Sequence, residues 1–513
     1  MFFYIFCTII LSLFIGVLGS SLIKDFINAD DKHIRVLFCV ALAILYKHSY
    51  GFLFCGLEYE DSYAFSFLGR LFANNIFTTS FLSEGIGIGS IESPELMQTY
   101  GGHFITYSTF LSYPIRLFGF SLPLVSAITT FLNTISLFIL SVFPNIKGRY
   151  SWMIAPSLFC ISPVINVFGN SFLCEPFSGM VVLSFCYLYY KYADNKVHVL
   201  FPAVAFALAI MTKRENISLI CLPLLCSLYR NGGIKKNILP FVKEITLYTI
   251  IIVLYLVFVQ NVFNIEAIES QDINAPTFSL TYFYRLAPVY LKALVTPRYF
   301  GITFFIFISA IASNVYKSKT FNFGLAVTTL WCIYFCLYTF HYRGYFFIKN
   351  NNVSVFDSFR YLNNFYCLIP IAIPLLLHNV RKKILISSAF ALLLLSIYPT
   401  FTLRRDYNRM EQCNRFEIPY LVLESINKDC DLFQTTIICS DVLVYQNIVN
   451  EGIRMCDIIN IEHLDLNDTS SKYFLICNDE EIPYLKERYR IDLDLSLWSK
   501  YKQIFDYTIY TIN

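Results

Sequence analysis

Apolar runs of about 20 residues recur along most of this chain, and an α-helix of that length crosses the hydrocarbon core of a bilayer. Of the 513 residues, 56% are hydrophobic and 15% are charged, whereas about a quarter of a soluble domain is charged. The sequence therefore predicts a mainly α, polytopic transmembrane helical bundle. The predicted spans, about twelve in number, cover residues 2–23, 36–55, 119–143, 151–169, 172–190, 197–212, 216–229, 238–259, 299–315, 320–340, 361–379 and 384–401.

The distribution of basic residues among the loops predicts which side each loop faces, because loops rich in Lys and Arg face the cytoplasm. Alternate connections carry the cations Lys24, Lys32, Arg35, Lys147, Arg149, Lys191, Lys196, Arg230, Lys235, Lys236, Lys317, Lys319, Arg381, Lys382 and Lys383. The other connections then face outward, namely the loop 56–118, the turns near 170 and 213, the loops 260–298 and 341–360, and the tail from 402. Both termini are expected outside, and the first span is expected to be retained because no basic stretch or cleavage site marks a signal peptide.

Charge and cysteine usage exclude some classes of function. The net charge of +3 is too small to indicate a nucleic-acid partner, and no basic block is present. Most of the 16 cysteines lie inside apolar runs, and no spacing of Cys and His is typical of a metal site. No metal and no cofactor is therefore expected, although clustered carboxylates could bind a divalent cation.

Three carboxylates, Glu58, Glu60 and Asp61, stand within four positions just after the second predicted span. Like charges this close repel one another, so a partly buried member should have a raised pKa and accept a proton from a hydroxyl near neutral pH. The alternative is a solvated acidic loop with no catalytic role.

The stretch MTKRENI places Lys213 and Arg214 in a short turn that the loop pattern puts outside, against the usual bias. A phosphate at the membrane boundary would explain both cations, because Arg offers a planar fork and Lys a point charge to its oxygens. Alternatively, the two flanking spans are paired wrongly and the turn is cytoplasmic.

Five more polar residues stand where predicted spans meet their boundaries. His103 follows a Gly pair and opens an amphipathic segment expected to lie along the interface, and Arg360 and Tyr361 stand where a late span begins. Glu175 stands at a helix start, where the helix dipole favours a carboxylate. Lys47 lies inside the second span, where a charge is costly unless it faces a polar cavity or its mouth. Helix anchoring, dipole compensation and packing are the alternatives to a functional role.

The tail, residues 402–513, is richer in charge than the rest of the chain. Its β-type runs TTIICS and KYFLIC alternate with the helix-like stretches VLVYQNIVNEG and EEIPYLKERY. The sequence predicts a small external α/β domain here.

Taken in order, these stretches resemble the GT-C superfamily of integral-membrane glycosyltransferases, which take sugars from polyprenyl-phosphate carriers. EDSYAFSFLGRLFANN resembles the family's acidic motif in the first large external loop, and GGHFITYSTFLSYPIRLFG resembles the His-led interfacial helix that follows. SFLCEPFSGMVVLSFCYLYYKY resembles the family's Glu-bearing helix start, and MTKRENISLICLPLL resembles its Thr-Arg-x-Glu turn. RYLNNFYCLIPIAIPLLL resembles its late Arg-Tyr helix. The resemblance covers residues 36–401, with residues 1–35 as an extra N-terminal helix and cytoplasmic loop. The external tail is similar in placement to that of members that modify surface glycans, including phage-type O-antigen glucosyltransferases.

The resemblance implies an inverting transfer of a hexose from a polyprenyl-phosphate carrier to a hydroxyl of a glycan or lipid-linked oligosaccharide. It implies that Glu60 or Asp61 is the base, and because the family more often has Asp first, the choice between the two stays open. The residues that would bind the donor phosphate are Lys213, Arg214, Arg360 and His103, and those that would support the site are Glu58, Glu175, Tyr361 and Lys47. A bacterial inner membrane, with the site on the periplasmic side, is the expected location.

Two other functions use some of the same residues. A glycan polymerase or ligase also takes polyprenyl-linked sugars, but it is expected to depend on a large late external loop with paired arginines, and loop 341–360 is short. A transporter or flippase of lipid-linked sugars could use the cations for phosphate, but it has no need of paired acids, and no internal repeat is visible.

Overall fold

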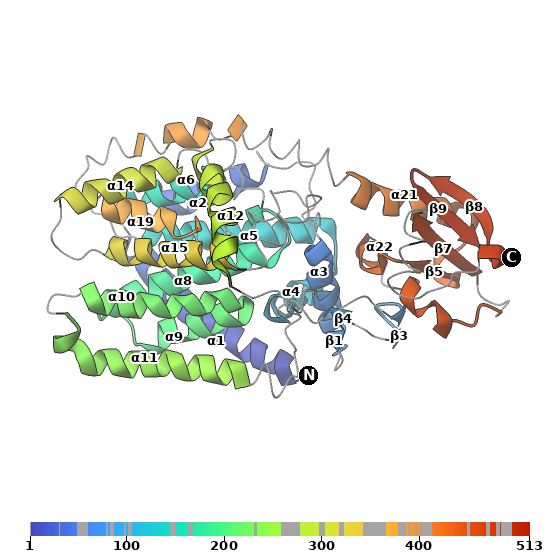
Figure 1. Ribbon diagram of the computed structural model, residues 1–513, viewed down its shortest axis with the longest axis horizontal. Helices are drawn as coiled ribbons and strands as arrows, with labels where there is room; N and C mark the ends of the chain where they lie inside the picture. Colours follow the sequence, from blue (N-terminus) through green and yellow to red (C-terminus); the bar gives the residue numbers. More distant parts are fainter. Residues whose placement is uncertain are drawn as a thin grey trace.

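The computed structural model describes residues 2–29, 31–48, 60–77, 81–82, 87–96, 99–100, 105–143, 150–162, 168–229, 233–257, 278–296, 303–317, 323–341, 366–377, 386–387, 390–395, 397–398, 402, 413–448, 452–467, 472–478, 483 and 495–512. Most of these residues form a bundle of helices, and a sheet lies at one end of it (Figure 1). The described helices up to residue 376 are α1 (Phe2–Ile27), α2 (Lys32–His48), α3 (Glu60–Ala73), α4 (Ile105–Phe118), α5 (Leu122–Val142), α6 (Ile154–Phe159), α8 (Cys174–Ala193), α9 (Leu200–Thr212), α10 (Cys221–Tyr229), α11 (Gly233–Val257), α12 (Leu280–Val295), α14 (Thr303–Lys317), α15 (Phe323–Phe340) and α19 (Ile369–Leu376).

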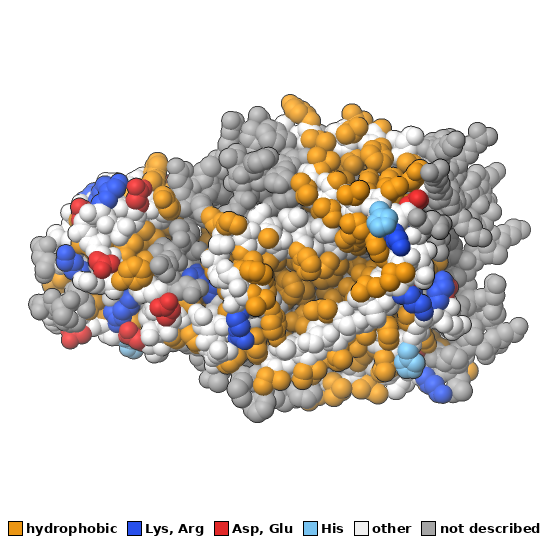
Figure 2. Space-filling model, turned by 180° about the vertical axis from the view of Figure 1, so that it is seen from behind, with side chains coloured by type: hydrophobic (Ala, Val, Ile, Leu, Met, Phe, Trp, Pro, Cys, Tyr) orange, Lys and Arg blue, Asp and Glu red, His pale blue; other side chains and the backbone are white. Residues whose placement is uncertain are grey.

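Three of the described helices are long and apolar enough to cross a membrane, namely Phe3–Ile27 within α1, α5 and α15. Helix α1 exposes apolar side chains such as Ile9, Leu13 and Ile23, which suits a surface in contact with lipid. On the face shown in Figure 2, hydrophobic side chains cover the bundle, and charged ones gather over the C-terminal part and toward the far end. The prediction of a mainly helical membrane protein is confirmed, whereas the full count of spans stays a prediction.

Some predicted spans differ from the helices that form. Residues 151–169 were expected to be one span, but a 3-10 turn at Ser151–Met153 leads into α6, which ends at Phe159. Helix α12 lies in a segment expected to be a loop. Its buried Leu286, Tyr290 and Leu294 recur at helical spacing, while Arg285 and Lys292 interrupt the apolar run. An amphipathic helix of this kind escapes a search for apolar runs.

The two ends of the bundle are defined by contacts between helix termini. At one end, called here the α4 end, the Tyr4 hydroxyl of α1 lies 3.0 Å from Ser112 Oγ of α4, and Thr106 of α4 donates to the Met211 carbonyl of α9 at 2.8 Å. At the other end, called the Lys191 end, Lys191 near the end of α8 pairs with Asp25 near the end of α1. The sheet and the N-terminus lie at the α4 end (Figure 1).

The sheet has seven strands in the order β3-β2-β6-β5-β7-β9-β8. Strands β5 (Thr435–Cys439), β6 (Arg454–Asp457) and β7 (Lys472–Asn478) are parallel, and β9 (Tyr507–Thr511) and β8 (Ser499–Ile504) extend the sheet antiparallel. The runs TTIICS and KYFLIC thus form β5 and β7, and VLVYQNIVNEG contains helix α22 (Val442–Ile448), which follows β5. Most of EEIPYLKERY lies outside the described residues.

Two strands of this sheet come from the first loop and not from the tail. Strand β2 (Ile88–Gly89) pairs antiparallel with β6 and with β3 (Pro94–Leu96), so Ile88 lies opposite Cys456. Gly89 has φ +124°, and a Cβ there would lie 2.6 Å from the Glu95 backbone nitrogen, so only glycine fits this turn. Outside this sheet, the short strands β1 (Phe81–Leu82) and β4 (Thr99–Tyr100) pair with each other in parallel.

Helix α3 joins the bundle to the sheet. Its Phe67, Leu68 and Leu71 are buried in one apolar cluster with residues of α21 (Cys413–Asp429), which packs beside the strands. Arg70 is 1% exposed, and its Nη1 donates to the Gln446 carbonyl of α22 at 2.5 Å. The first loop and the tail, which the sequence suggests are separate parts, therefore share a sheet and a core.

Candidate functional site

A buried ion pair stands at the α4 end of the bundle. Glu175 lies in the first turn of α8, and Lys213 directly follows α9; the Lys213 Nζ is 2.9 Å from Glu175 Oε1. Both side chains are at most 5% exposed, so solvent screens this pair little. The structure thus brings together two residues that the sequence singled out separately.

The turn after α9 is held in place by a hydrogen-bonded asparagine. Residues Arg214–Ile220 form a 3-10 helix, and Asn216 within it is fully buried. Its Nδ2 donates to Ser178 Oγ of α8 and to the Ala209 carbonyl, and its Oδ1 accepts from Tyr334 of α15 at 2.8 Å. In the sequence, Asn216 begins Asn-Ile-Ser, a pattern that marks it only as a glycosylation sequon, whereas its amide is fully engaged in fixing the turn between three helices.

Arg214 and Glu215 extend the charged cluster. Arg214 is partly exposed and lies near Tyr255, close to the end of α11. Within the described part of the chain, Glu215 Oε2 is buried and has no hydrogen-bond partner. The cluster contains two cations, Lys213 and Arg214, and two anions, Glu175 and Glu215. Its net charge is therefore zero.

Helix α4 links this cluster to the helix that begins with the paired acids. The buried ring of Tyr107 on α4 lies between Phe65 of α3, at 5.2 Å between centroids, and Phe177 of α8, at 5.5 Å. Phe65 stands one helical turn beyond Asp61, and Phe177 stands two residues beyond Glu175. The first turns of α3 and α8 therefore lie at the same end of the bundle, next to α4.

The two cations of the first loop have structural roles. Arg116 of α4 donates to the carbonyls of Phe72 and Ala73 and to Asn75 Oδ1, so it satisfies free groups at the end of α3. Arg70 reaches α22, and its guanidinium lies 4.7 Å from the Phe120 ring centroid. Both fix the position of α3, and their partners are too distant in sequence to be found from the loop alone.

Several predicted site residues are only partly described. Glu60 and Asp61 form the first residues of α3, and Lys47 lies in the last turn of α2; their backbone is described but their side chains are not. Glu58, His103, Arg360 and Tyr361 lie outside the described residues. A helix was expected to begin near His103, and α4 begins two residues later, at Ile105. Leu117 and Phe118 at the other end of α4 are strongly exposed.

No group of three or more His, Cys, Asp or Glu side chains that could hold a metal ion occurs among the residues that the structure describes. The cysteines whose side chains the structure describes form no disulfide with one another, and many of them are buried in the bundle. Lys213 is paired with Glu175, so the partly exposed Arg214 is the cation of this cluster that is placed to stabilise an anion.

No protein-family model and no curated protein matches this sequence. Its fold does match solved structures. ArnT from Cupriavidus metallidurans bound to undecaprenyl phosphate has a TM-score of 0.60 at 10% identity, over 94% of this chain and 98% of that chain. The apo state of the same protein has a TM-score of 0.59 at 12% identity, with the same coverage. The archaeal oligosaccharyltransferase AglB from Archaeoglobus fulgidus, in complex with an inhibitory peptide and a dolichol-phosphate, has a TM-score of 0.47 at 13% identity, over 94% of this chain and 75% of that chain.

At such low identity the likeness to ArnT shows the fold, and the likeness to AglB is too weak to add to it. The chain has the ArnT fold over nearly its whole length, including the sheet. The predicted fold agrees with this likeness, and membership of the GT-C superfamily stays a prediction.

Proposed function

We propose that this protein is an inverting glycosyltransferase that moves a hexose from a polyprenyl-phosphate carrier to an acceptor hydroxyl at the external face of the membrane. The observation that carries the proposal is the match of fold to ArnT, a protein captured with undecaprenyl phosphate, over 94% of this chain. The charged cluster supports it, because Lys213 and Arg214 lie at the same end of the bundle as the start of α3, and Tyr107 of α4 lies between α3 and α8.

In the proposed reaction, Glu60 or Asp61 takes the proton of the acceptor hydroxyl. The hydroxyl oxygen forms a bond to the anomeric carbon while the bond from that carbon to the phosphate oxygen breaks, and the electron pair leaves with the phosphate. Attack from the opposite face inverts the anomeric configuration, and no covalent enzyme intermediate, metal or other cofactor is needed. The leaving phosphate is already anionic, so it requires nearby positive charge and no acid.

The ion pair of Lys213 with Glu175 gives Lys213 and Arg214 different proposed roles. Lys213 is buried and neutralised by Glu175, so its first role is to hold the turn against α8. Arg214 is the more exposed of the two and becomes the main candidate for the donor phosphate, with Arg360 and His103 as further ligands. The buried Glu215 Oε2 would accept a hydrogen bond from a hydroxyl of the donor sugar. Glu58, Tyr361 and Lys47 stay proposed supporting residues.

The setting of the reaction is part of the same proposal. The chain would cross a bacterial inner membrane about twelve times, counting the extra N-terminal helix. The donor lipid would enter from the bilayer, and the tail with its sheet would meet a surface glycan or lipid-linked oligosaccharide, such as O-antigen, on the periplasmic side. Because the sheet shares a core with α3, an acceptor bound there would lie next to the acid-bearing helix.

The test uses the full-length protein in lipid vesicles, with a polyprenyl-phosphate hexose as donor and extracted surface polysaccharide as acceptor. We expect one hexose to be added to the acceptor, with a linkage of inverted configuration by NMR, and a weaker apparent affinity for donor in Arg214→Gln. Lys428→Gln, a surface change with the same loss of charge, is the control. Donor that crosses the vesicle membrane without transfer would identify a transporter, and growth of long polymer would identify the polymerase; either result would overturn the proposal.

A further inference from the structure

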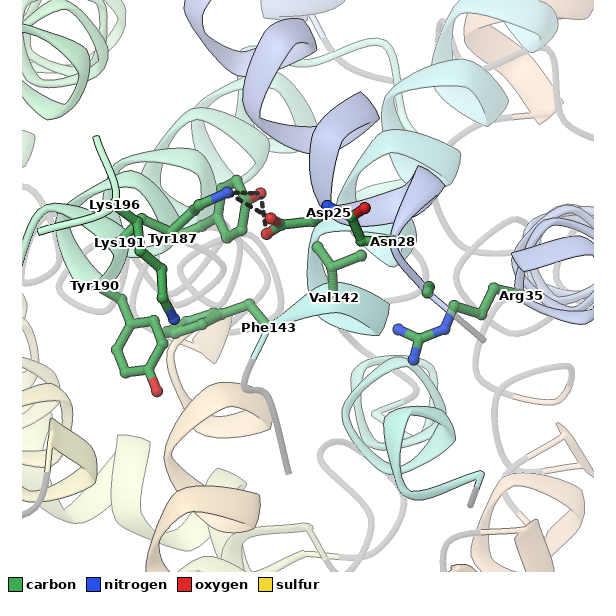
Figure 3. A pocket seen from close by; sticks show the side chains of 10 residues that line it. Asp25, Asn28, Arg35, Val142, Phe143, Tyr187, Tyr190, Lys191 and Lys196 are labelled. Carbon is green, nitrogen blue, oxygen red and sulfur yellow. Dashed lines mark hydrogen bonds and ion pairs between the residues drawn. The ribbon is translucent and has the colours of Figure 1, made fainter. Parts of the chain in front are cut away.

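A polar cavity of about 300 Å³ lies at the Lys191 end of the bundle. It is enclosed by the ends of α1, α5 and α8 and by the start of α2 (Figure 3). Glu175 and Lys191 are sixteen residues apart on the single helix α8, which corresponds to about 24 Å at 1.5 Å per residue. That distance is most of the thickness of a hydrocarbon core of about 30 Å, so the cavity stands at the opposite membrane boundary from the candidate transfer site.

Three cations line this cavity against one carboxylate. Arg35 comes from α2, Lys191 from α8 and Lys196 from the turn that follows α8, and Asp25 of α1 is the acid. The lining therefore carries a net charge of +2, and at the surface Lys196 also pairs with Asp194, 3.1 Å away. A cationic ligand is disfavoured by this balance, and an anion is favoured.

The cations are held in position by neighbouring groups. Lys191 Nζ lies 2.6 Å from Asp25 Oδ1, and the Tyr187 hydroxyl donates to Asp25 Oδ2 at 2.7 Å. Arg35 donates from Nη1 to the Ser141 carbonyl at 2.6 Å, and its guanidinium lies 5.1 Å from the Trp152 ring centroid. In Figure 3, the Lys196 side chain lies on one side of Val142 and Phe143, and the Arg35 guanidinium lies on the other. Anchored cations lose less side-chain entropy when an anion binds between them.

The helix ends around the cavity would repel an anion if their carbonyls were free. These carbonyls largely accept hydrogen bonds from the protein itself. The turn after α8 closes back on it, with the backbone N–H of Asn195 bonded to the Tyr192 carbonyl and that of Lys196 bonded to the Lys191 carbonyl. The Ser141 carbonyl near the end of α5 accepts from Arg35. The cationic side chains thus dominate the field in the cavity.

We propose that this cavity binds a phosphate group at the membrane boundary opposite to the transfer site. The aromatic and aliphatic part of its wall, formed by Val142, Phe143 and Tyr190, suits a phosphate that is attached to an apolar body, as in the headgroup region of an anionic phospholipid. Free inorganic phosphate has the same chemistry and is the other source. The site is built from residues far from the α4 end, so it does not depend on the proposed transferase activity.

The experiment measures binding to the purified full-length protein after removal of native lipid. Phosphatidylglycerol, the zwitterionic phosphatidylcholine and inorganic phosphate are added separately, and bound ligand is counted by native mass spectrometry and by the rise in thermal stability. The variants are Arg35→Gln and Lys196→Gln. Lys196 is 55% exposed and its ion pair with Asp194 lies at the surface, so its variant should fold even if Arg35→Gln does not. Lys428→Gln in α21 is the control with the same change of charge far from the cavity.

We expect phosphatidylglycerol to bind and phosphatidylcholine not to bind, with about tenfold weaker binding in Lys196→Gln, the factor that corresponds to 1.4 kcal/mol, and unchanged binding in Lys428→Gln. The same dependence on variants with inorganic phosphate alone would support the site with a free anion as its ligand. Binding of neither probe, or equal loss in Lys196→Gln and Lys428→Gln, would overturn the proposal. Sugar transfer is not read in this assay, so failure here and failure of the transferase proposal are separate results.

Discussion

Replacing Lys213 with Met should destabilise the protein much more than replacing an exposed lysine, because the change leaves the Glu175 carboxylate buried without its counter-charge. The two side chains are at most 5% exposed and their charged atoms are 2.9 Å apart. Removing one partner of a buried pair typically lowers the free energy of unfolding by about 3–5 kcal/mol, since the remaining charge keeps its desolvation penalty and loses the compensating attraction.

The double variant Lys213→Met with Glu175→Gln separates the pair from its surroundings. With both charges gone, no uncompensated charge is left, so the double variant should be more stable than Lys213→Met alone. The matched control is the pair between Lys428 and Glu424 on α21, whose charged atoms are 3.4 Å apart and whose side chains are 66% and 46% exposed. Solvent screens such a pair, so Lys428→Met should lower the free energy of unfolding by about 1 kcal/mol or less.

The assay is unfolding in mixed detergent micelles by titration with dodecyl sulfate, followed by circular dichroism at matched protein concentrations. A double-mutant cycle on each pair then gives its coupling energy. A free energy of unfolding for Lys213→Met within about 1 kcal/mol of wild type, or a double variant that simply sums the two single losses, would refute the buried-pair reasoning.

Three further predictions concern the contacts around α3 and the sheet. Arg70→Met should lower the free energy of unfolding by about 1–3 kcal/mol and slow sugar transfer, because a buried carbonyl of α22 loses its donor; unchanged values in the micelle titration and transfer assay would contradict this. The Arg454 guanidinium holds the pKa of Glu95 below its usual range. The pair therefore stabilises the contact of β3 with the tail at pH values above the ordinary Glu pKa of about 4.3. This stabilisation is lost as the pH falls through the lowered pKa of Glu95. Amide hydrogen exchange of β2 and β3, corrected for intrinsic rates, should therefore speed up on acidification in wild type. The variant Glu95→Gln should show no such pH step. Identical pH profiles for wild type and Glu95→Gln would exclude the effect. Gly69→Val should destabilise by about 1–3 kcal/mol, because a Cβ at this position would lie 3.0 Å from a side-chain atom of α4, whereas Gly16→Val, with nothing within 4 Å, should cost less in the same titration.

Periodicity and apolar length were enough to predict the long helices and the main strands. The predicted span 119–143 is α5, Leu122–Val142, where Ser121 accepts a hydrogen bond from the Leu124 backbone and caps the helix start. The first five residues of TTIICS form β5, Thr435–Cys439, and all five are buried, as expected of a β-branched run with helices nearby. These elements are set by local side-chain pattern, so sequence alone identifies them.

The arrangement around the candidate site could not be read in the same way, because it depends on partners far apart in the chain. Strand β2 has only two residues, and nothing near Ile88 indicates that it pairs with Cys456 of the tail. Lys213 and Glu175 were each noticed for their position at a helix boundary, but a salt bridge between them needs α8 and α9 to pack in one register. Asn216 gave no signal beyond its sequon, since an amide that bonds to three helices looks like any other amide in sequence.

Transfer of sugar by cells that carry Glu60→Gln or Asp61→Asn tests the central claim most directly. Surface polysaccharide is analysed by mass spectrometry at matched levels of membrane-inserted protein, with wild type and Glu92→Gln, an exposed acid of the same loop, as controls. The account predicts that at least one of the two variants lacks one hexose per glycan repeat, while wild type and Glu92→Gln add it. Normal addition of the hexose by both Glu60→Gln and Asp61→Asn would contradict the assignment of the catalytic base to the start of α3.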